Sequence, residues 1–182
     1  MFERRKDGQF RARIVAQGFT QVPGIDFKYS HAPVINDVTF HLLLIEWFVN
    51  ENWVALQIDI RTAFLYGDLE EEIYMKMPEG MRENQDECMM LLKSTYGLVQ
   101  AARQWYVQLV RFLRKHDYLR SLIDPCLIIK RRNQELVVIL IYVDDCALFG
   151  TNDLVYETIR LIASRFKIRK EEELCKYVGC EI

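Results

Sequence analysis

The feature that most constrains this chain is an apolar run that stops at two adjacent aspartates. Residues 136–142 are aliphatic or aromatic, Asp144 and Asp145 follow Val143, and residues 146–150 are again mostly apolar. A run of this length favours a buried strand and is too short to cross a bilayer. We therefore predict a two-stranded hairpin over residues 136–150, with both carboxylates at its tip.

Carboxylates beside an apolar sheet repel each other and lose hydration, so their ionised forms cost stability unless a cation neutralises them. A third aspartate, Asp59, lies near the end of the alternating segment 53–60, on the face opposite Ile60. Three such carboxylates can converge on divalent ions, and oxygen ligands select Mg²⁺ or Mn²⁺ over zinc. Two ions about 4 Å apart are the usual arrangement for nucleotidyl transfer. The alternative is a polar hairpin turn, because aspartate is common in turns.

The rest of the chain mixes strand and helix patterns. Alternation predicts strands over residues 9–16 and 53–60, and two apolar runs separated by the polar turn 131–135 predict strands over 126–130 and 136–142. The tail over 174–182 is strand-like. Helical patterns cover residues 38–50, 101–118 and 154–166. Glycine and proline predict a loop over 17–33 and a turn at 78–80, followed by an acidic loop to residue 87. This order indicates an α+β fold with an antiparallel sheet backed by helices.

The three predicted helices differ in pattern. Residues 38–50, capped by Asn36 or Asp37, are apolar nearly all round, so we expect this helix to be buried. Residues 154–166 follow a cap among residues 151–153. The helix over 101–118 is amphipathic, and its apolar stripe consists of Trp105, Leu109, Phe112 and Leu113.

The net charge is only −2, but acidic and basic residues are concentrated in separate segments of the chain. Residues 68–87 contain eight acidic and two basic side chains, whereas residues 93–132 contain nine basic and two acidic ones. Such a basic block can present a surface to a polyanion, with ordinary solvated faces as the alternative. The five cysteines form no C-x-x-C pair, which favours reduced thiols in an intracellular protein, and Cys126 and Cys146 lie in apolar runs.

Six sequence blocks resemble a known family. The motif at residues 142–145, Y-V-D-D, resembles the active-site box of reverse transcriptases. The other five occur in family order and resemble the Ty1/copia class of LTR retrotransposons. They are R-A-R-I-V-A-Q-G-F-T-Q-V-P-G-I-D-F (11–27), A-P-V (32–34), Q-I-D-I-R-T-A-F-L-Y-G-D-L-E-E-E-I-Y-M-K-M-P-E-G (57–80), Y-G-L-V-Q-A-A-R-Q-W (96–105) and K-Y-V-G-C-E-I (176–182).

The resemblance implies roles for the residues that match these blocks. It implies that Asp59, Asp144 and Asp145 are catalytic and hold two Mg²⁺ ions, with Mn²⁺ as a substitute, and that the main chain of Ile60 is a further ligand. Phe64 matches the aromatic steric gate that rejects a ribose 2′-hydroxyl; a core phenylalanine is the alternative.

Contacts with nucleotide and template are implied elsewhere. Arg11 and Arg13 match the fingers strand that binds the triphosphate, and the pattern does not show which of them does so. Gln100 lies in the block that contacts the incoming nucleotide and template, with a surface glutamine as the alternative. Template-backbone contacts are expected of four basic residues, with a solvated helix face as the alternative: Arg103, Arg111, Arg114 and Lys115.

Residues 176–182 resemble the primer-grip hairpin. The chain departs from the family pattern at Ala102, where proline is usual, and at Val99, which replaces lysine. These departures alter the start of the helix without removing a catalytic group.

The resemblance covers essentially the whole chain. It implies that residues 1–182 form a single fingers–palm region of a right-hand polymerase, with palm sheet, helices and fingers strands. The implied function is that of an RNA-directed DNA polymerase, which extends a primer on an RNA or DNA template with dNTPs. The resemblance also implies that residues 1–182 contain neither the thumb nor the ribonuclease H domain, and that the ribonuclease H domain is expected downstream in the parent polyprotein. Intracellular retrotransposon particles in the cytoplasm are the implied location, with the nucleus as the alternative and no membrane partner. Truncation favours a rival reading: a catalytically inactive remnant that at most binds nucleic acid weakly.

Overall fold

The computed structural model describes residues 2–4, 8, 10–78, 80–81, 87–177 and 180–181. The chain forms two compact units. The first combines Met1–Ala32 with Phe64–Trp105, and the second combines Pro33–Ala63 with Tyr106–Ile182. The boundary therefore falls within helix α2 (Ala101–Arg114).

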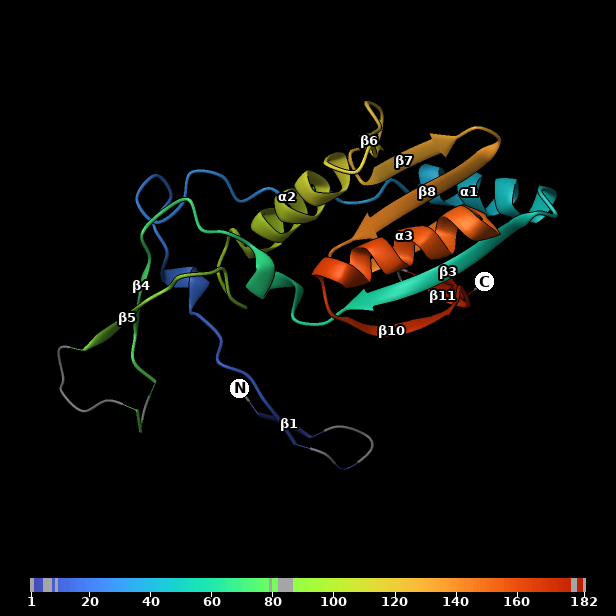
Figure 1. The fold of residues 1–182 in the computed structure, drawn as a ribbon. Helices are drawn as coiled ribbons and strands as arrows, with labels where there is room; N and C mark the ends of the chain where they lie inside the picture. Colours follow the sequence, from blue (N-terminus) through green and yellow to red (C-terminus); the bar gives the residue numbers. More distant parts are fainter. Residues whose placement is uncertain are drawn as a thin grey trace. The chain divides into compact units, whose positions relative to one another are not determined.

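A six-stranded antiparallel sheet forms the centre of the second unit (Figure 1). Its strands lie in the order β10–β3–β9–β8–β7–β6. They are β3 (Trp53–Ile60), β6 (Leu119–Arg120), β7 (Leu127–Arg132), β8 (Glu135–Tyr142), β9 (Asp145–Thr151) and β10 (Ile168–Glu173). The apolar run of β8 is buried on both faces because this strand lies inside the sheet.

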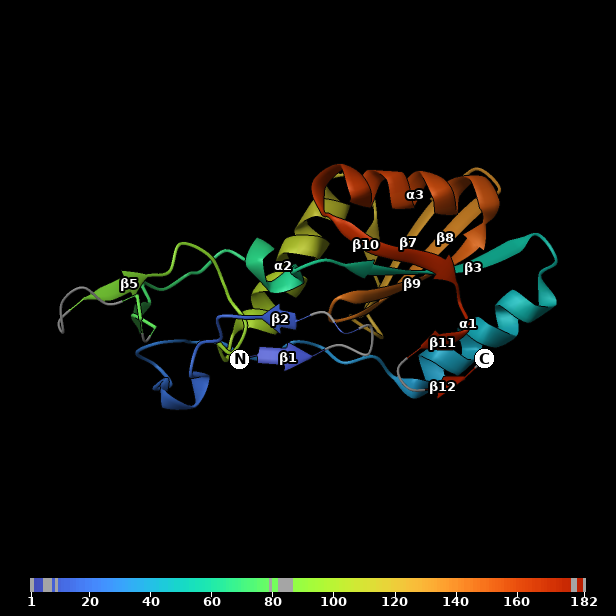
Figure 2. The same ribbon diagram turned by 90° about the horizontal axis from the view of Figure 1, so that it is seen from below.

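Helices cover both faces of this sheet (Figure 2). On one face, α3 (Asn152–Arg165) lies over β3, β8 and β9 and buries Leu154, Ile159 and Ile162. On the other face, α1 (Asp37–Val49) contributes Phe40 and Leu43 to a core that includes Ala55, Leu140, Ala147 and Phe149. Because side chains alternate along a strand, Asp59 and Asp145 share the face of Ala55 and Ala147. The α1 side of the sheet therefore carries these two aspartates.

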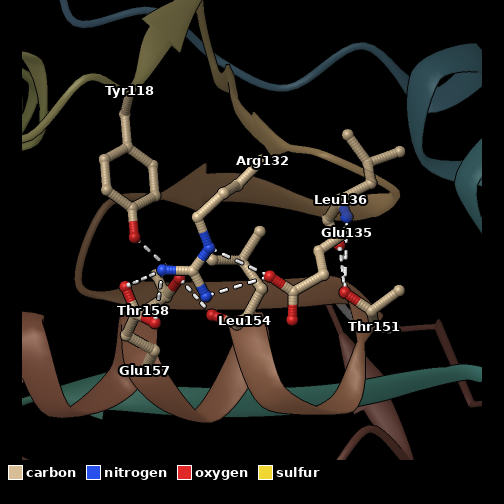
Figure 3. A network of polar contacts seen from close by, with 8 residues as sticks. All are labelled: Tyr118, Arg132, Glu135, Leu136, Thr151, Leu154, Glu157 and Thr158. Atoms are coloured by element: carbon tan, nitrogen blue, oxygen red, sulfur yellow. Dashed lines mark hydrogen bonds and ion pairs between the residues drawn. The ribbon is translucent and has the colours of Figure 1, made fainter.

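Polar contacts fix α3 to the sheet (Figure 3). The Tyr118 and Thr158 hydroxyls share a buried hydrogen bond of 2.7 Å. At the end of β7, the Arg132 guanidinium donates to Glu135 across the hairpin and to Glu157 of α3, each at 3.0 Å. These bonds join the β7–β8 hairpin to the helix that covers it.

The first unit consists of short elements: β1 (Phe2–Arg4), β2 (Phe10–Ala12), η1 (Gly18–Thr20), β4 (Tyr74–Lys76) and β5 (Cys88–Met90). Strands β1 and β2 form one antiparallel pair, and β4 and β5 form another. A short 3-10 helix, η2 (Ala63–Tyr66), begins at the unit boundary. The backbone N–H of Ala16 donates to the Tyr96 carbonyl at 2.8 Å. A Cβ on Gly97, whose φ is +92°, would lie 2.1 Å from the Ala16 carbonyl oxygen, so only glycine fits there.

Most predicted elements are confirmed. Strand β3 spans the predicted residues, and the hairpin of β8 and β9 has its turn at Val143 and Asp144. The Asn36 side chain caps α1 by accepting from the Val38 N–H at 2.9 Å. The architecture is a mixed α/β one with a mostly antiparallel sheet and three helices among the described residues. Cys126 and Cys146 are buried free thiols. None of the helices in the described ranges has the length and apolarity needed to cross a bilayer.

The prediction that α1 is buried was wrong. Only Phe40 and Leu43 are buried, whereas the exposed apolar side chains are Val38, Leu42, Ile45, Phe48 and Val49, with Phe48 86% exposed. Helix α1 contacts the sheet on a single side, and hydrophobicity without a helical period does not show how many sides a helix covers.

The other differences between prediction and structure concern element boundaries and one missed strand. The strand predicted over 9–16 is β2 alone, and α2 ends at Arg114 instead of residue 118. The tail forms a short hairpin of β11 (Lys176–Tyr177) and β12 (Cys180–Glu181). Strand β10 was missed because its sequence, I-R-K-E-E-E, lacks apolar alternation; it is an exposed edge strand, where charges are tolerated. Most of the predicted acidic loop lies outside the described residues.

Candidate active site

The three aspartates come together at one end of strands β3 and β9. Asp59 and Asp145 are direct cross-strand partners in the β3–β9 pair. The backbone N–H of Ile60 donates to the carbonyl of Asp144 at 2.9 Å, which joins the end of β3 to the hairpin turn. The ladder therefore places three carboxylate-bearing residues at one edge of the second unit.

The backbone beside these aspartates adopts a costly conformation at two positions. Thr62, three residues after Asp59, and Val143, just before Asp144, both have φ of +54°. A left-handed conformation is unfavourable for β-branched residues and costs about 1–2 kcal/mol. Such outliers concentrate at functional sites, where the surrounding structure holds them in place.

The electrostatics of Asp145 reflect its neighbours. Burial raises the pKa of the Asp145 carboxyl, and the negative charges of Asp144 and Asp59 raise it further, while a hydrogen bond with the Gln57 side chain opposes them. Gln57 shares a strand face with Asp59 because it lies two residues earlier in β3. The sequence reasoning did not single out Gln57, although its position on that face could have indicated it.

A basic residue neutralises Asp59 from the neighbouring strand. The β10–β3 register shifts between Ile168 and Lys170, so Arg169 is the extra residue of a β-bulge. Its guanidinium forms an ion pair with the Asp59 carboxylate. Bulges redirect side chains in this way. Nothing in the sequence pattern indicates a bulge at Arg169, and its role was therefore missed.

The three aspartates are chemically suited to a hard divalent cation such as Mg²⁺. Their carboxylates supply only oxygen ligands and carry an excess of negative charge. Among the described residues, however, no three such side chains already stand in an arrangement that could hold an ion. The pairing of Asp59 with Arg169 gives a physical reason, since this carboxylate points to the guanidinium. A cation bound at Asp59 would compete with the guanidinium for this carboxylate.

Comparison with known proteins identifies the family of this chain. The family model for reverse transcriptase (RNA-dependent DNA polymerase) matches residues 2–182. The chain belongs to the copia-type reverse transcriptase family. Among its relatives, the retrovirus-related Pol polyprotein from transposon RE2 of Arabidopsis thaliana is 34% identical over 95% of this chain. The corresponding protein from transposon TNT 1-94 of Nicotiana tabacum is 39% identical over 82% of it.

More distant relatives extend the match to yeast. The transposon Ty1-BL Gag-Pol polyprotein of Saccharomyces cerevisiae is 32% identical over 84% of this chain. The chain spans 12% of the length of each of the two plant polyproteins and 8% of the yeast one. No solved structure matches it at a significant level. The reverse transcriptase assignment thus rests on the sequence of this one region.

The other predicted nucleotide-binding residues belong to the first unit. The Phe64 ring packs against Tyr96, with ring centroids 4.8 Å apart, and is half-buried. Gln100 is fully buried and donates to the carbonyl of Asp26 at 3.2 Å, so the alternative of a surface glutamine was wrong. The Arg13 guanidinium lies 5.7 Å from the Tyr96 ring centroid. Arg11 lies in β2, and its side chain is outside what the structure describes.

The predicted template-binding residues of this reverse transcriptase chain divide between the units. Arg103, in the first unit, lies over the Tyr29 ring with its guanidinium 5.1 Å from the centroid. Arg111, Arg114 and Lys115, in the second unit, are exposed on or just after α2. Their role in template binding stays a prediction.

The segment that resembles the primer grip contributes one anchor. Tyr177 of β11 is buried, and its hydroxyl donates to the Leu140 carbonyl at 2.8 Å and lies 3.5 Å from the Asp145 carbonyl. Burial raises the pKa of Tyr177 well above its usual range, so the phenol stays neutral. This tyrosine fixes β11 against the strands of the aspartate hairpin.

Proposed function

We propose that this chain is the polymerase region of a reverse transcriptase and that it catalyses RNA-directed DNA synthesis at Asp59, Asp144 and Asp145. The observation that supports this most strongly is the pairing of Asp59 with Asp145, beside Asp144, in a chain whose residues 2–182 match the family. In this proposal the second unit is the palm and the first unit contains the fingers. Template, primer and dNTPs are the substrates, and a ribonuclease H domain of the parent polyprotein is the partner.

The proposed chemistry is nucleotidyl transfer to a primer 3′-hydroxyl. The three carboxylates would hold two Mg²⁺ or Mn²⁺ ions, which supply Lewis acidity at the attacking hydroxyl and the leaving pyrophosphate. The Ile60 main chain is a proposed further ligand. Phe64 would exclude a ribose 2′-hydroxyl by its bulk.

Nucleotide contacts are assigned to the first unit in this proposal. Arg11 or Arg13 would bind the triphosphate through charge-assisted hydrogen bonds. The buried amide of Gln100 supports the nucleotide-binding segment by holding the loop at Asp26. Arg103 would contact the template backbone.

A non-catalytic remnant that binds nucleic acid weakly is the rival function. One observation favours it: Asp59 is neutralised by Arg169, so this carboxylate is already paired within the protein. The two functions differ in whether Asp59 binds a metal ion in competition with Arg169.

Primer extension distinguishes the two functions. The chain is incubated with poly(rA)/oligo(dT), dTTP and Mg²⁺ or Mn²⁺, beside Asp144→Asn and the control Asp153→Asn, which changes an exposed aspartate in the first turn of α3. We expect extension by the wild type and the control, and a loss of at least about 100-fold in Asp144→Asn. Equal extension by all three would refute the assignment of the site. No extension by any, even when the downstream polyprotein sequence is added, would support the remnant.

A further inference from the structure

The structure divides the basic block of residues 93–132 into two groups. Four of its nine cations already have partners within the protein: Lys93 pairs with Asp68, Arg103 lies over Tyr29, Lys130 donates to the His116 carbonyl at 3.0 Å, and Arg132 bridges Glu135 and Glu157. Arg132 is drawn in Figure 3. None of the other five forms an ion pair with a carboxylate within the described ranges, although Arg120 has a side-chain hydrogen bond with the neutral Tyr106 phenol. These five are Arg111, Arg114, Lys115, Arg120 and Arg131.

Four of these five cations line one pocket of about 470 Å³ in the second unit. Arg111 and Arg114 lie in the last turn of α2, Lys115 follows directly after it, and Arg120 comes from the short edge strand β6. The rest of the lining is aromatic or aliphatic and contains no acidic side chain; Tyr106 and Val110 are largely buried. An open pocket with four cations and an apolar floor is suited to an anion, because the low-dielectric floor strengthens each charge–charge interaction.

This pocket lies away from the aspartates. The Phe112 ring of α2 contacts the Phe166 ring at the end of α3, with centroids 5.2 Å apart, so this part of α2 lies on the α3 side of the sheet. Asp59 and Asp145 belong to the opposite face. Strand β6 is also four positions from β3 in the sheet order, a separation of about 19 Å at the usual strand spacing.

We propose that backbone phosphates of a nucleic-acid strand bind in this pocket, through Arg111, Arg114, Lys115 and Arg120. The two arginines on α2 are separated by about 4.5 Å of helix rise, Lys115 follows the helix, and Arg120 adds a cation from β6. Such a spread matches successive phosphates of a strand better than one small anion. The resemblance already implies template-backbone contacts for Arg111, Arg114 and Lys115; the pocket separates them from Arg103 and adds Arg120. The inference rests on the proposed nucleic-acid substrate, but binding at this site requires neither the aspartates nor a metal.

Salt-dependent binding tests this site. Binding of a fluorescently labelled single-stranded oligo(dT) 20-mer is followed by anisotropy from 50 to 200 mM salt, without divalent cations. The pocket variant is Arg111→Gln with Arg114→Gln, and the matched control is Arg160→Gln with Arg165→Gln, which removes two exposed cations from α3. We expect the pocket variant to lose about tenfold in affinity and about 1.4 in the slope of log K against log salt, since single strands give about 0.7 per phosphate contact.

Additional variants and a second ligand test which anion binds and whether charge alone is required. Arg111→Lys with Arg114→Lys keeps both charges and should retain the wild-type slope. Arg120→Gln should lower the slope by about 0.7, although it lies on a different element. An equal loss in the pocket variant and the α3 control would overturn the proposal. The proposal would also be overturned if the wild type binds inorganic tripolyphosphate through this pocket while the pocket variant binds the oligonucleotide as tightly as the wild type. Because no metal is present, failure here leaves the primer-extension result untouched, and the two proposals fail separately.

Discussion

The two faces of the six-stranded sheet differ in how they are covered. On the α3 face, Ile58, Ile139 and Leu148 are completely buried under a helix that polar contacts hold in place. On the α1 face, apolar packing covers one end, while the other end carries Asp59 and Asp145. The closed face supplies hydrophobic stabilisation, whereas the open end keeps like charges together at a cost in stability. This division is typical of a scaffold that supports a functional site on one side.

The largest effect is expected at the open end. Asp145→Asn should lower primer extension by about 1000-fold, equivalent to about 4 kcal/mol of transition-state stabilisation, because a proposed metal ligand is lost. The same change should raise the free energy of unfolding without metal, because it removes a carboxylate whose ionised form is disfavoured. Primer extension and urea unfolding measure the two effects, and a variant that loses both activity and stability would contradict this division of roles.

The stability gain of Asp145→Asn should depend on pH. The pKa of Asp145 is raised in the folded state, so the folded protein binds this proton more tightly than the unfolded chain, whose aspartates titrate near about 3.9. The cost of ionisation is therefore absent below about pH 3.9, grows as the pH rises through the folded-state pKa and is constant above it. Urea unfolding of both proteins between pH 4 and 8 should show this growing difference. A difference that shrinks as the pH rises would have the wrong sign.

The closed face should respond to a cavity. Leu148→Ala should lower the free energy of unfolding by about 3 kcal/mol, because Leu148 is completely buried and the site cannot collapse fully. The matched control is Leu122→Ala, which removes the same atoms from a side chain that is 98% exposed and should cost less than about 0.5 kcal/mol. Urea unfolding monitors both variants. Similar losses in the two would show that the α3 face is not the main source of stability.

The smallest effect is expected at the hairpin turn. Val143→Gly should raise the free energy of unfolding by about 0.5–1 kcal/mol, because glycine relieves the cost of a positive φ but adds entropy to the unfolded chain. The control, Val34→Gly, changes an exposed valine without a positive φ and should be neutral or slightly destabilising. If both variants lose stability equally in urea unfolding, Val143 holds no strain.

The sequence predicted the elements that carry the aspartates, because their patterns are local. The alternation of residues 53–60 and the apolar run before Asp144 both depend on neighbouring residues only, and both strands formed as expected. The family blocks identified the same three aspartates independently. The pairing of Asp59 with Asp145 then followed from the order of β3 and β9 in the sheet.

Features that depend on three-dimensional neighbours could not be predicted in this way. The bulge that directs Arg169 to Asp59 depends on a register shift between β10 and β3, and β10 itself has no apolar pattern. The exposure of Phe48 depends on how many elements surround α1. The pocket at Arg120 joins an edge strand to a helix that precedes it in the chain.

The most direct test of the central claim is Mn²⁺ binding measured by calorimetry, because it requires neither a template nor any further domain. We predict that the wild type and Asp153→Asn bind Mn²⁺, that Asp59→Asn and Asp145→Asn each lose at least about tenfold in affinity, and that Arg169→Gln binds more tightly because its ion pair no longer competes. Equal Mn²⁺ affinity in the wild type, Asp59→Asn and Asp145→Asn would contradict the claim that the open end of this sheet is a cation-dependent catalytic site.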